Sequence, residues 1–341
     1  MQVTINRQPM MTQALISSGV FRPAPLRILD GGARHGAESQ WDVYGRQAEI
    51  IAFEPDAEEC KRLNETTASQ TGPRVTYYPV ALGREKKMAA LHVANFPDSS
   101  SLLPTNHVLM DRFAMVDYLT QVRTVMVETT DIDSFVDESR VGHLDFMKLD
   151  VEGAELATLE GAGKALNDSL LGLIVEVWFQ PEHVGRPLFA HIDEYLRGFG
   201  YTLFDIRDLM RWRRKTQCGS EYQQWVGRGQ LMYANALYLR DIPGAMIAGE
   251  YQISDRSRMQ LLKLASVAEL FGYNDFALEV LKYGHHFGVL KKEEVESLSA
   301  LLAEKPPTPA VRLVSHLRAG LRRVVPRTIR TRIRSIIQSS S

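Results

Sequence analysis

The sequence predicts an α/β protein with a seven-stranded, mostly parallel sheet and a small helical annex toward its C-terminal end. Short apolar runs alternate with amphipathic stretches between residues 26 and 240, which is typical of buried parallel strands joined by helices. From residue 255 the apolar positions recur at helical spacing alone. The 341 residues are 45% hydrophobic and 24% charged, and this composition excludes the disordered and fibrous classes.

The expected elements follow this pattern along the chain. Residues 1–25 are expected to form a short helix and an extended lead-in rich in proline. Strands are expected at residues 26–30, 49–54, 75–80, 144–150, 172–179, 201–206 and 234–240, and helices near 36–45, 56–69, 153–166 and 187–198. Segment 84–130 does not fit a simple crossover, because two further strand-like runs, 86–95 and 122–130, predict a hairpin with a polar loop between them.

Three regions are expected beyond the lead-in. The main domain covers residues 26–240, and the annex, residues 254–304, contains two or three antiparallel helices. A helical unit of this size cannot bury its own apolar face, so we expect it to pack on the main domain or on a partner. A stiff Pro-rich linker and a basic tail then occupy residues 305–341.

Charge separates this tail from the rest of the chain. Residues 306–341 contain eight arginines and no Asp, Glu or Lys. Subtracting these eight charges from the net charge of −1 leaves the first 305 residues with −9, so no DNA partner is expected for the body. Apolar residues recur among the arginines of 311–336, which is typical of segments that bind anionic membrane surfaces or a partner. A solvated or disordered tail is the main alternative, and RNA contact is a weaker one.

The sequence also predicts a cellular location. No apolar run reaches the ~18 residues that a membrane span requires, and the first residues lack the apolar stretch of a signal peptide. Cys60 and Cys218 belong to no cluster of Cys and His, which favours free thiols and disfavours structural zinc. We expect a cytoplasmic protein, at the inner face of the membrane if the tail binds there.

A glycine-rich turn carries the strongest local signal. Asp30 ends the first expected strand, and Gly32 and Gly36 follow it where a tight turn and close approach of a ligand require small residues. Glu54 ends the second expected strand, 24 residues after Asp30, where an acid accepts the hydroxyls of a ribose. The glycine spacing differs from that of a dinucleotide site, so a dinucleotide oxidoreductase remains the weaker alternative.

A second group of polar residues lies farther along the chain. Asp150 ends a buried strand, and Glu152 and Glu155 fall in the first turn of the next helix, where helix capping and function are both open. Glu176 interrupts an apolar strand, and a buried acid requires a partner or a role. His183 follows that strand and is either a base active near neutral pH or an exposed loop histidine.

These residues carry a family resemblance. The pattern D-x-x-K-x-D-x-E-G-x-E-x-x-x-L-x-G, which begins at Asp145, closely resembles the FkbM-type methyltransferases. Asp30-Gly31-Gly32-Ala33 is similar to the first motif of that family, and Ala81-Leu82-Gly83 to the segment after its third strand. Arg34 stands where class I methyltransferases usually have Gly or Asn, and a positive φ there would strain it. The resemblance covers about residues 26–240.

The resemblance implies a Rossmann-like class I fold and an S-adenosyl-L-methionine-dependent O-methyltransferase. The implied acceptor is a hydroxyl of a sugar, glycan or related metabolite. The cofactor would be held by Asp30, Gly32, Gly36, Glu54 and the backbone of Ala81, and the acceptor would face Asp150, Glu176 and His183. Asp150 and Glu176 lie on adjacent strands and are also able to hold Mg²⁺, but we favour a site without metal.

A rival interpretation comes from another functional class. In it the body binds the cofactor without turnover, and the annex and basic tail bind a partner or a membrane. Release of S-adenosylhomocysteine in the presence of an acceptor distinguishes the two.

Overall fold

The computed structural model describes residues 5–6, 8–67, 72–215 and 228–303. The chain divides into two units, Met1–Leu302 and Ala303–Ser341. Our expectations for the linker, for the basic segment 311–336 and for Cys218 lie outside the described residues. The first unit is therefore the one whose architecture follows.

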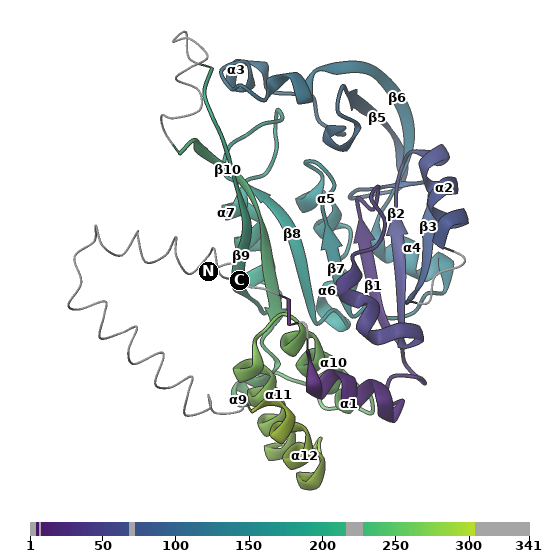
Figure 1. Ribbon diagram of the computed structural model, residues 1–341, viewed down its shortest axis with the longest axis vertical. Coiled ribbons are helices and arrows are strands. Elements are labelled where there is room, and N and C mark those ends of the chain that lie inside the picture. Colours follow the sequence, from purple (N-terminus) through teal and green to yellow (C-terminus); the bar gives the residue numbers. More distant parts are fainter. Residues whose placement is uncertain (1–4, 7, 68–71, 216–227, 304–341) are drawn as a thin grey trace, which may run out of the picture. The chain divides into compact units, whose positions relative to one another are not determined.

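A seven-stranded sheet forms the centre of this unit (Figure 1). Its strands lie in the order β3-β2-β1-β7-β8-β10-β9. They span β1 Leu26–Gly31, β2 Ala48–Phe53, β3 Arg74–Tyr78, β7 Phe146–Leu149, β8 Gly172–Trp178, β9 Tyr201–Trp212 and β10 Gln230–Arg240. Only β10 runs antiparallel to its neighbours, β8 and β9. The predicted α/β class and the mostly parallel sheet are confirmed.

The strand order creates one polar edge. β1 pairs with β2 on one side and with β7 on the other, so the chain changes direction across the sheet between these strands. Open α/β sheets bind their ligands beyond the carboxyl ends of the strands at such a switch point. β2, β1, β7 and β8 all end at this edge because they are parallel.

Helices cover both faces of the sheet. They are α1 Met10–Ser18, the 3₁₀ segment η1 Ser39–Gln47, α2 Ala57–Thr67, α4 Ile132–Ser139, α5 Glu155–Glu160, α6 Gly163–Asp168, α7 Phe189–Arg197 and α9 Ile242–Ala248. Along β1, Ile28 and Leu29 pack into different hydrophobic clusters, because successive side chains of a strand point to opposite faces. The sheet therefore has a core on each side.

Two of the expected helices differ in the structure. The helix expected near 36–45 is a 3₁₀ segment, and Gly45 breaks it with φ 48°. The helix expected at 153–166 is two short helices, α5 and α6. At their junction a Cβ on Gly161 would lie 2.7 Å from the carbonyl oxygen of Gly83, and the Asp133 carboxylate accepts the amides of Lys164 and Ala165 at 2.7 and 3.0 Å. Tertiary contacts thus end α5 early.

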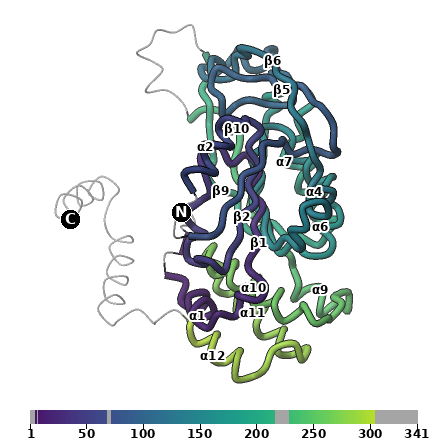
Figure 2. The backbone as a smooth tube through the Cα atoms, turned by 90° about the vertical axis from the view of Figure 1, so that its right-hand side faces the viewer, coloured from purple at the N-terminus to yellow at the C-terminus, as the bar shows by residue number. Residues whose placement is uncertain are grey.

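A second, smaller sheet follows β3. Its order is β4-β6-β5, with β4 Ala81–Leu82, β5 Lys87–Ala94 and β6 Gln121–Thr130. β5 and β6 pair antiparallel, as the sequence predicted. The connection between them contains η2 Pro97–Ser99, α3 His107–Met110 and η3 Val116–Leu119. We call residues 81–130 the insertion. In Figures 1 and 2 the insertion lies beyond the end of the large sheet.

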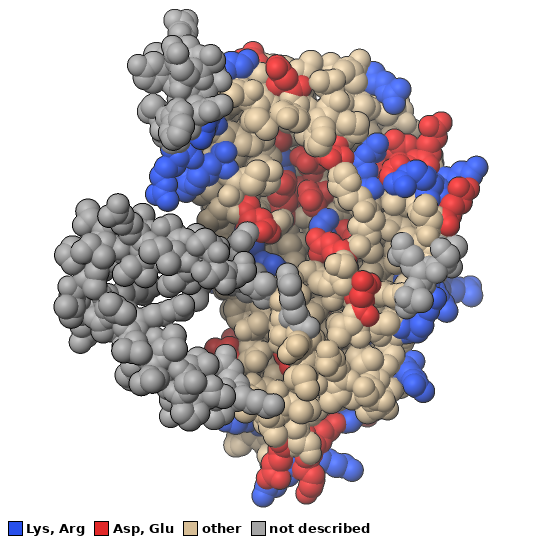
Figure 3. Space-filling model, viewed as in Figure 1, with Lys and Arg blue, Asp and Glu red and all other residues tan. Residues whose placement is uncertain are grey.

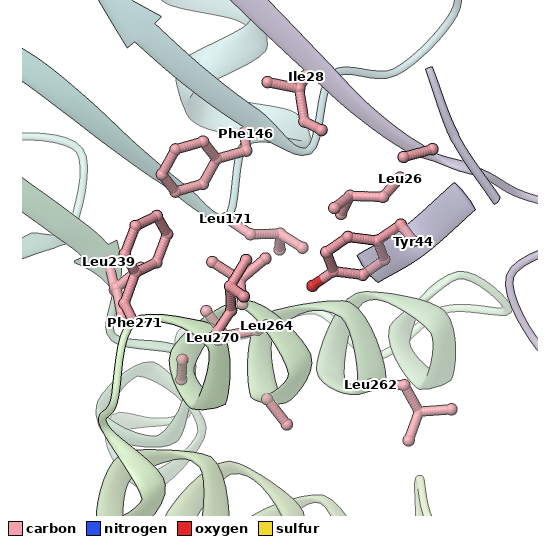
Figure 4. Close-up of a cluster of buried hydrophobic side chains, with 14 of the residues drawn as sticks. Leu26, Ile28, Tyr44, Phe146, Leu171, Leu239, Leu262, Leu264, Leu270 and Phe271 are labelled. Carbon is pink, nitrogen blue, oxygen red and sulfur yellow. The ribbon is translucent and has the colours of Figure 1, made fainter. Parts of the chain in front are cut away.

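The annex consists of three helices that pack on the sheet. They are α10 Ser257–Leu270, α11 Asn274–His286 and α12 Lys292–Leu302. The rings of Phe146 in β7 and Phe271 after α10 stack with centroids 5.5 Å apart (Figure 4), and Lys263 Nζ lies 2.6 Å from the buried Asp145 carboxylate. Of the two alternatives that we considered, the annex therefore packs on the main domain.

Among the described residues, no helix combines the length and the apolar character that crossing a membrane requires.

Candidate functional site

The turn after β1 lies directly against the loop after β7. Gly32 has φ +82°, and a Cβ on it would lie 1.8 Å from the carbonyl oxygen of Asp150. The Asp150 amide donates to the Gly31 carbonyl at 3.1 Å. Gly36 also has a positive φ, +87°, whereas Arg34 does not, so the strain considered for Arg34 is absent.

Asp30 is buried at the end of β1 with a lysine as its partner. Its side chain is 5% exposed, and Lys148 Nζ lies 3.4 Å from it and 3.8 Å from Asp150. Burial raises the pKa of Asp30 to about 6, although the Lys148 charge works against this. Burial lowers the pKa of Lys148, but the charges of Asp30 and Asp150 outweigh it and the net change is upward. Lys148 and the two acids thus place charged groups at the ends of β1 and β7.

Glu54 follows β2 and is 4% exposed. Its Oε1 accepts the Asp56 amide at 2.8 Å and lies 3.7 Å from Arg34 Nη1. Burial raises the pKa of Glu54, partly offset by that amide and by Arg34. Arg34 and His35 also contact Asp98 of η2, at 3.5 and 2.8 Å. The insertion thus contacts the turn beside Glu54.

The predicted backbone contact at Ala81 lies in the same region. Ala81 is buried in β4, and its neighbour Leu82 packs on the β1 turn, since a Cβ on Gly31 would lie 2.9 Å from Leu82 Cδ1. The structure therefore gathers Asp30, Gly32, Glu54 and Ala81 at one edge, with Gly36 in the same turn.

Carboxylates also gather at this edge, near the end of β7. Oxygens of Asp150, Glu152 and Glu176 lie within 4.8 Å of one another, in a group that combines two loop residues with one residue of β8. Glu152 has a positive φ of 50°. In Figure 3 acidic side chains line a hollow on the visible face of the molecule. The two predicted acceptor-side acids, Asp150 and Glu176, are thus brought together.

A buried arginine joins the carboxylates. The Arg186 side chain is 0% exposed, and its Nη2 lies 2.9 Å from Glu176 and 3.3 Å from Glu155. Its Nη1 lies 3.7 Å from Glu152 and donates to Glu182. Four acids on three segments therefore share one guanidinium, whose planar fork suits several carboxylates at once.

These groups shift one another's protonation. Burial raises the pKa of Glu152 and of Glu176 well above the ordinary value; neighbouring carboxylates add to this, and Arg186 opposes it. Glu182 differs: burial favours a higher pKa, but the charges and hydrogen bonds of Arg186 and His183 together outweigh it and lower the pKa. Burial and the same carboxylates raise the pKa of Tyr233 to about 12. A raised pKa makes the ionised form of such a carboxylate a stronger base than an ordinary one.

The two open interpretations of Glu152 and Glu155 separate here. Glu155 is buried and accepts the amides of Val151 and Gly153 at 3.1–3.2 Å, so it organises the loop before α5. Glu152 instead points its carboxylate into the acidic group, and its carbonyl accepts the hydroxyl of Ser101 from the insertion.

His183 is buried rather than exposed. It is 1% exposed, and its Nδ1 lies 3.1 Å from a Glu182 oxygen. Among the described residues no hydrogen bond or ion pair joins it to Asp150 or Glu176. His183 thus lies beside Glu182, and its role as an acceptor-side base stays a prediction.

The same carboxylates have the chemistry of a magnesium site, because Mg²⁺ prefers oxygen ligands. Arg186, however, already contacts Glu152 and Glu176, and Glu176 Oε2 accepts both Arg186 Nη2 and the Trp178 indole at 2.9 and 2.7 Å. Arg186 therefore already balances the charge of two of these three carboxylates, and we assign no metal to the group.

Sequence reasoning missed Arg186 and Glu182 and gave Lys148 no role beyond the motif. Lys148 stands in that motif two residues before Asp150, so its pairing with acids could have been predicted. Arg186 follows β8 in a loop without a recognisable pattern, and its partners Glu152 and Glu155 lie more than 30 residues earlier. No local spacing signals such a contact.

Comparison with solved structures finds remote likenesses. A magnesium protoporphyrin IX methyltransferase from Synechocystis PCC 6803, with bound SAM, has 8% identity and a TM-score of 0.29, with 69% of this chain and 80% of that chain covered. An rRNA methylase from Streptococcus thermophilus has 10% identity and a TM-score of 0.30, with coverage of 70% and 98%. Sp1610 from Streptococcus pneumoniae, described as a putative tRNA (m1A22) methyltransferase, has 10% identity and a TM-score of 0.31, with coverage of 88% and 100%. No curated protein matches the sequence significantly.

A family model gives the decisive match. The model of the methyltransferase FkbM domain matches residues 30–203, just over half of the chain. The match begins at Asp30 and includes the turn, Glu54, the acidic group and Arg186. With its seven-stranded sheet and the site at the carboxyl edge, the chain belongs to the FkbM methyltransferase domain family.

Proposed function

We propose that the protein transfers a methyl group from S-adenosylmethionine to a hydroxyl of a sugar, a glycan or a related metabolite. The observation that carries the proposal is Glu176, a buried carboxylate with a raised pKa beside Asp150 at the ligand edge of the sheet. Hydroxyl acceptors are weak nucleophiles, and a positioned base helps them to react.

The donor-side residues fit the cofactor. Glu54 uses Oε1 for its contacts with Asp56 and Arg34, and Oε2 remains for the ribose hydroxyls. Asp30 would bind the amino group of the methionine part, and the turn of Gly32 and Gly36 would allow its backbone to approach the ligand. When bound, S-adenosylmethionine supplies an activated methyl group on a sulfonium sulfur.

The acceptor-side residues then prepare the hydroxyl. S-adenosylmethionine would supply its methyl group to the acceptor oxygen and leave as S-adenosylhomocysteine, and Glu176 would take the hydroxyl proton. Asp150 would orient the acceptor from the end of β7, so that the oxygen lies in line with the bond that breaks. Correct placement is a large part of what such a transfer requires from a protein.

An acceptor screen with labelled S-adenosylmethionine, run with and without EDTA, tests the proposal. We expect label in an O-methyl product of a sugar or glycan, and equal rates in both conditions. Label only on nitrogen or carbon would contradict O-methylation. Tight cofactor binding without release of S-adenosylhomocysteine for any acceptor would favour the non-catalytic scaffold instead.

We further propose that the protein is cytoplasmic and associates peripherally with anionic membrane through residues 311–336. Support comes from the eight arginines of residues 306–341, among which no acid occurs. Each basic residue near an anionic surface contributes about 1 kcal/mol of attraction before screening. Such binding would bring the enzyme to membrane-linked glycan acceptors.

A further inference from the structure

We propose that Arg186 is a positioning residue that fixes Glu176 with one oxygen facing the acceptor, an inference that rests on the proposed function. The Arg186 side chain has no exposed surface, so its guanidinium does not meet bulk solvent. Burying a guanidinium is costly unless acids pair with it. A buried arginine has either a structural or a functional task. The contacts of Arg186 indicate a functional one.

The first contact concerns the orientation of Glu176. Its Oε2 accepts Arg186 Nη2–H at 2.9 Å and the Trp178 indole N–H at 2.7 Å. Both donors reach the same oxygen, so together they oppose rotation of the carboxylate. Among the described residues neither donor reaches Oε1, and 8% of the Glu176 side chain is exposed. Oε1 is therefore the oxygen available to an acceptor hydroxyl.

The second set of contacts fixes Arg186 itself. Its guanidinium also binds Glu155 at 3.3 Å and Glu182, and lies 4.6 Å above the Trp178 ring. Glu155 in turn holds the amides of Val151 and Gly153, which belong to the loop that carries Asp150. Arg186 thus links the loop after β7 to the base on β8, so that both acceptor-side acids share one support.

The third observation is the balance of charge around Glu176. Acidic side chains interact with Glu176 from two elements: Asp150 and Glu152 from the loop after β7, and Glu155 from α5. Glu182 in the loop after β8 shares Arg186 with it, and the phenol of Tyr233 in β10 also interacts with it. Arg186 supplies a positive charge that counters these acids. Burial and Asp150 raise the pKa of Glu176, and Arg186 partly offsets this rise. Loss of Arg186 should therefore raise the pKa of Glu176 further.

Two mild variants separate positioning from simple structural support. Arg186→Lys keeps a positive charge but loses the planar guanidinium that binds several carboxylates at once. Trp178→Phe removes the second hydrogen-bond donor to Glu176 Oε2. The matched control is Lys263→Met, which breaks another buried cation–carboxylate pair, that with Asp145 at 2.6 Å, away from the site. We avoid Arg186→Met as the main variant, because four acids left without a cation would favour unfolding.

The first readout is the pH dependence of kcat/KM for the acceptor, together with cofactor affinity. We expect Arg186→Lys to lower kcat about tenfold or more. The acidic limb of its pH–rate profile, where activity falls as the base is protonated, should move to higher pH. Trp178→Phe should move this limb in the same direction by a smaller amount. In both variants the Kd for S-adenosylmethionine should stay within about threefold of the wild-type value. Lys263→Met should lose stability while its pH profile stays that of the wild type.

The second readout needs no acceptor. The C=O stretch of a protonated buried carboxyl is followed by infrared spectroscopy against pH in the full chain, and Glu176→Gln identifies the band of Glu176. In Arg186→Lys this band should titrate at higher pH than in the wild type. Unchanged titration would overturn the positioning role even if methylation is observed. A shift without methylation of any hydroxyl would leave the positioning role standing and reject the proposed acceptor class.

Discussion

The backbone carbonyl of Asp150 occupies the space that a side chain on Gly32 would need. An ideal Cβ on Gly32 would lie 1.8 Å from that oxygen, and Gly32 has φ +82°. The two residues end neighbouring parallel strands, β1 and β7. The turn after β1 and the loop after β7 are therefore in direct backbone contact, so we expect a change in one to displace the other.

Gly32→Ala should consequently disrupt the site. The new methyl group meets backbone rather than a side chain that is able to move, and positive φ adds about 1 kcal/mol of strain. We expect a lower free energy of unfolding and loss of measurable S-adenosylmethionine binding. Gly36→Ala is the control, since it has a similar φ but its nearest atom is Tyr77 Oη at 3.7 Å. Denaturant titration and calorimetry measure both variants, and equal effects would contradict the contact argument.

Glu54→Ala should weaken cofactor binding while the fold survives. The carboxylate would lose charge-assisted hydrogen bonds to the ribose, each worth about 1.5–3 kcal/mol at most. We expect at least about tenfold lower affinity for S-adenosylmethionine by calorimetry. Glu49→Ala on the same strand is the control, because Glu49 pairs at the surface with Arg27. Unchanged affinity in Glu54→Ala would remove Glu54 from the cofactor site.

Cofactor affinity should also depend on pH through Asp30. Its pKa is raised to about 6, so the unliganded carboxyl gains a proton as the pH falls through 6 and loses its attraction for an amino group. Affinity for S-adenosylmethionine should therefore rise between about pH 5 and 7 and then level off. Asp30→Asn should bind weakly at every pH in calorimetric titrations. The same pH dependence in that variant would assign the effect to another group.

Asp150→Asn and Glu176→Gln should separate chemistry from cofactor binding. If these acids serve the acceptor, kcat falls by about 10²-fold or more for the base, while the Kd for S-adenosylmethionine stays within a few fold. Glu160→Gln, which removes a surface partner of Arg84, should behave as the wild type in the same steady-state assay. Full activity of both acceptor-side variants would place the chemistry elsewhere.

The basic tail yields a prediction for the full-length protein. Replacing Arg322, Arg323, Arg327 and Arg330 with Gln removes half of the eight arginines of residues 306–341. We expect the wild type to sediment with anionic liposomes at low salt and to be released as salt rises, and the variant to remain in the supernatant. Methylation of an acceptor in solution should be equal for both. Absence of the wild type from the liposome pellet would reject membrane binding.

Local sequence patterns determined most of the elements. Alternation of apolar runs located the seven strands and the hairpin of β5 and β6, and the acid-plus-glycine turn located Asp30 and Glu54 at strand ends. These features depend on residues that are near one another in the chain, so spacing alone reveals them. The same holds for Glu176, whose charge stands out within an apolar strand.

Tertiary structure decided what those residues contact. The end of α5 depends on the contact of Gly161 with Gly83, and the separate tasks of Glu152 and Glu155 appear only when the loop is folded. Arg186 binds acids from three segments, and only Glu182 lies close to it in the sequence; Glu152 and Glu155 have no local signal there. Pairing of buried charges depends on which segments the fold brings within a few ångströms, and this distance is set by packing over the whole domain rather than by local periodicity.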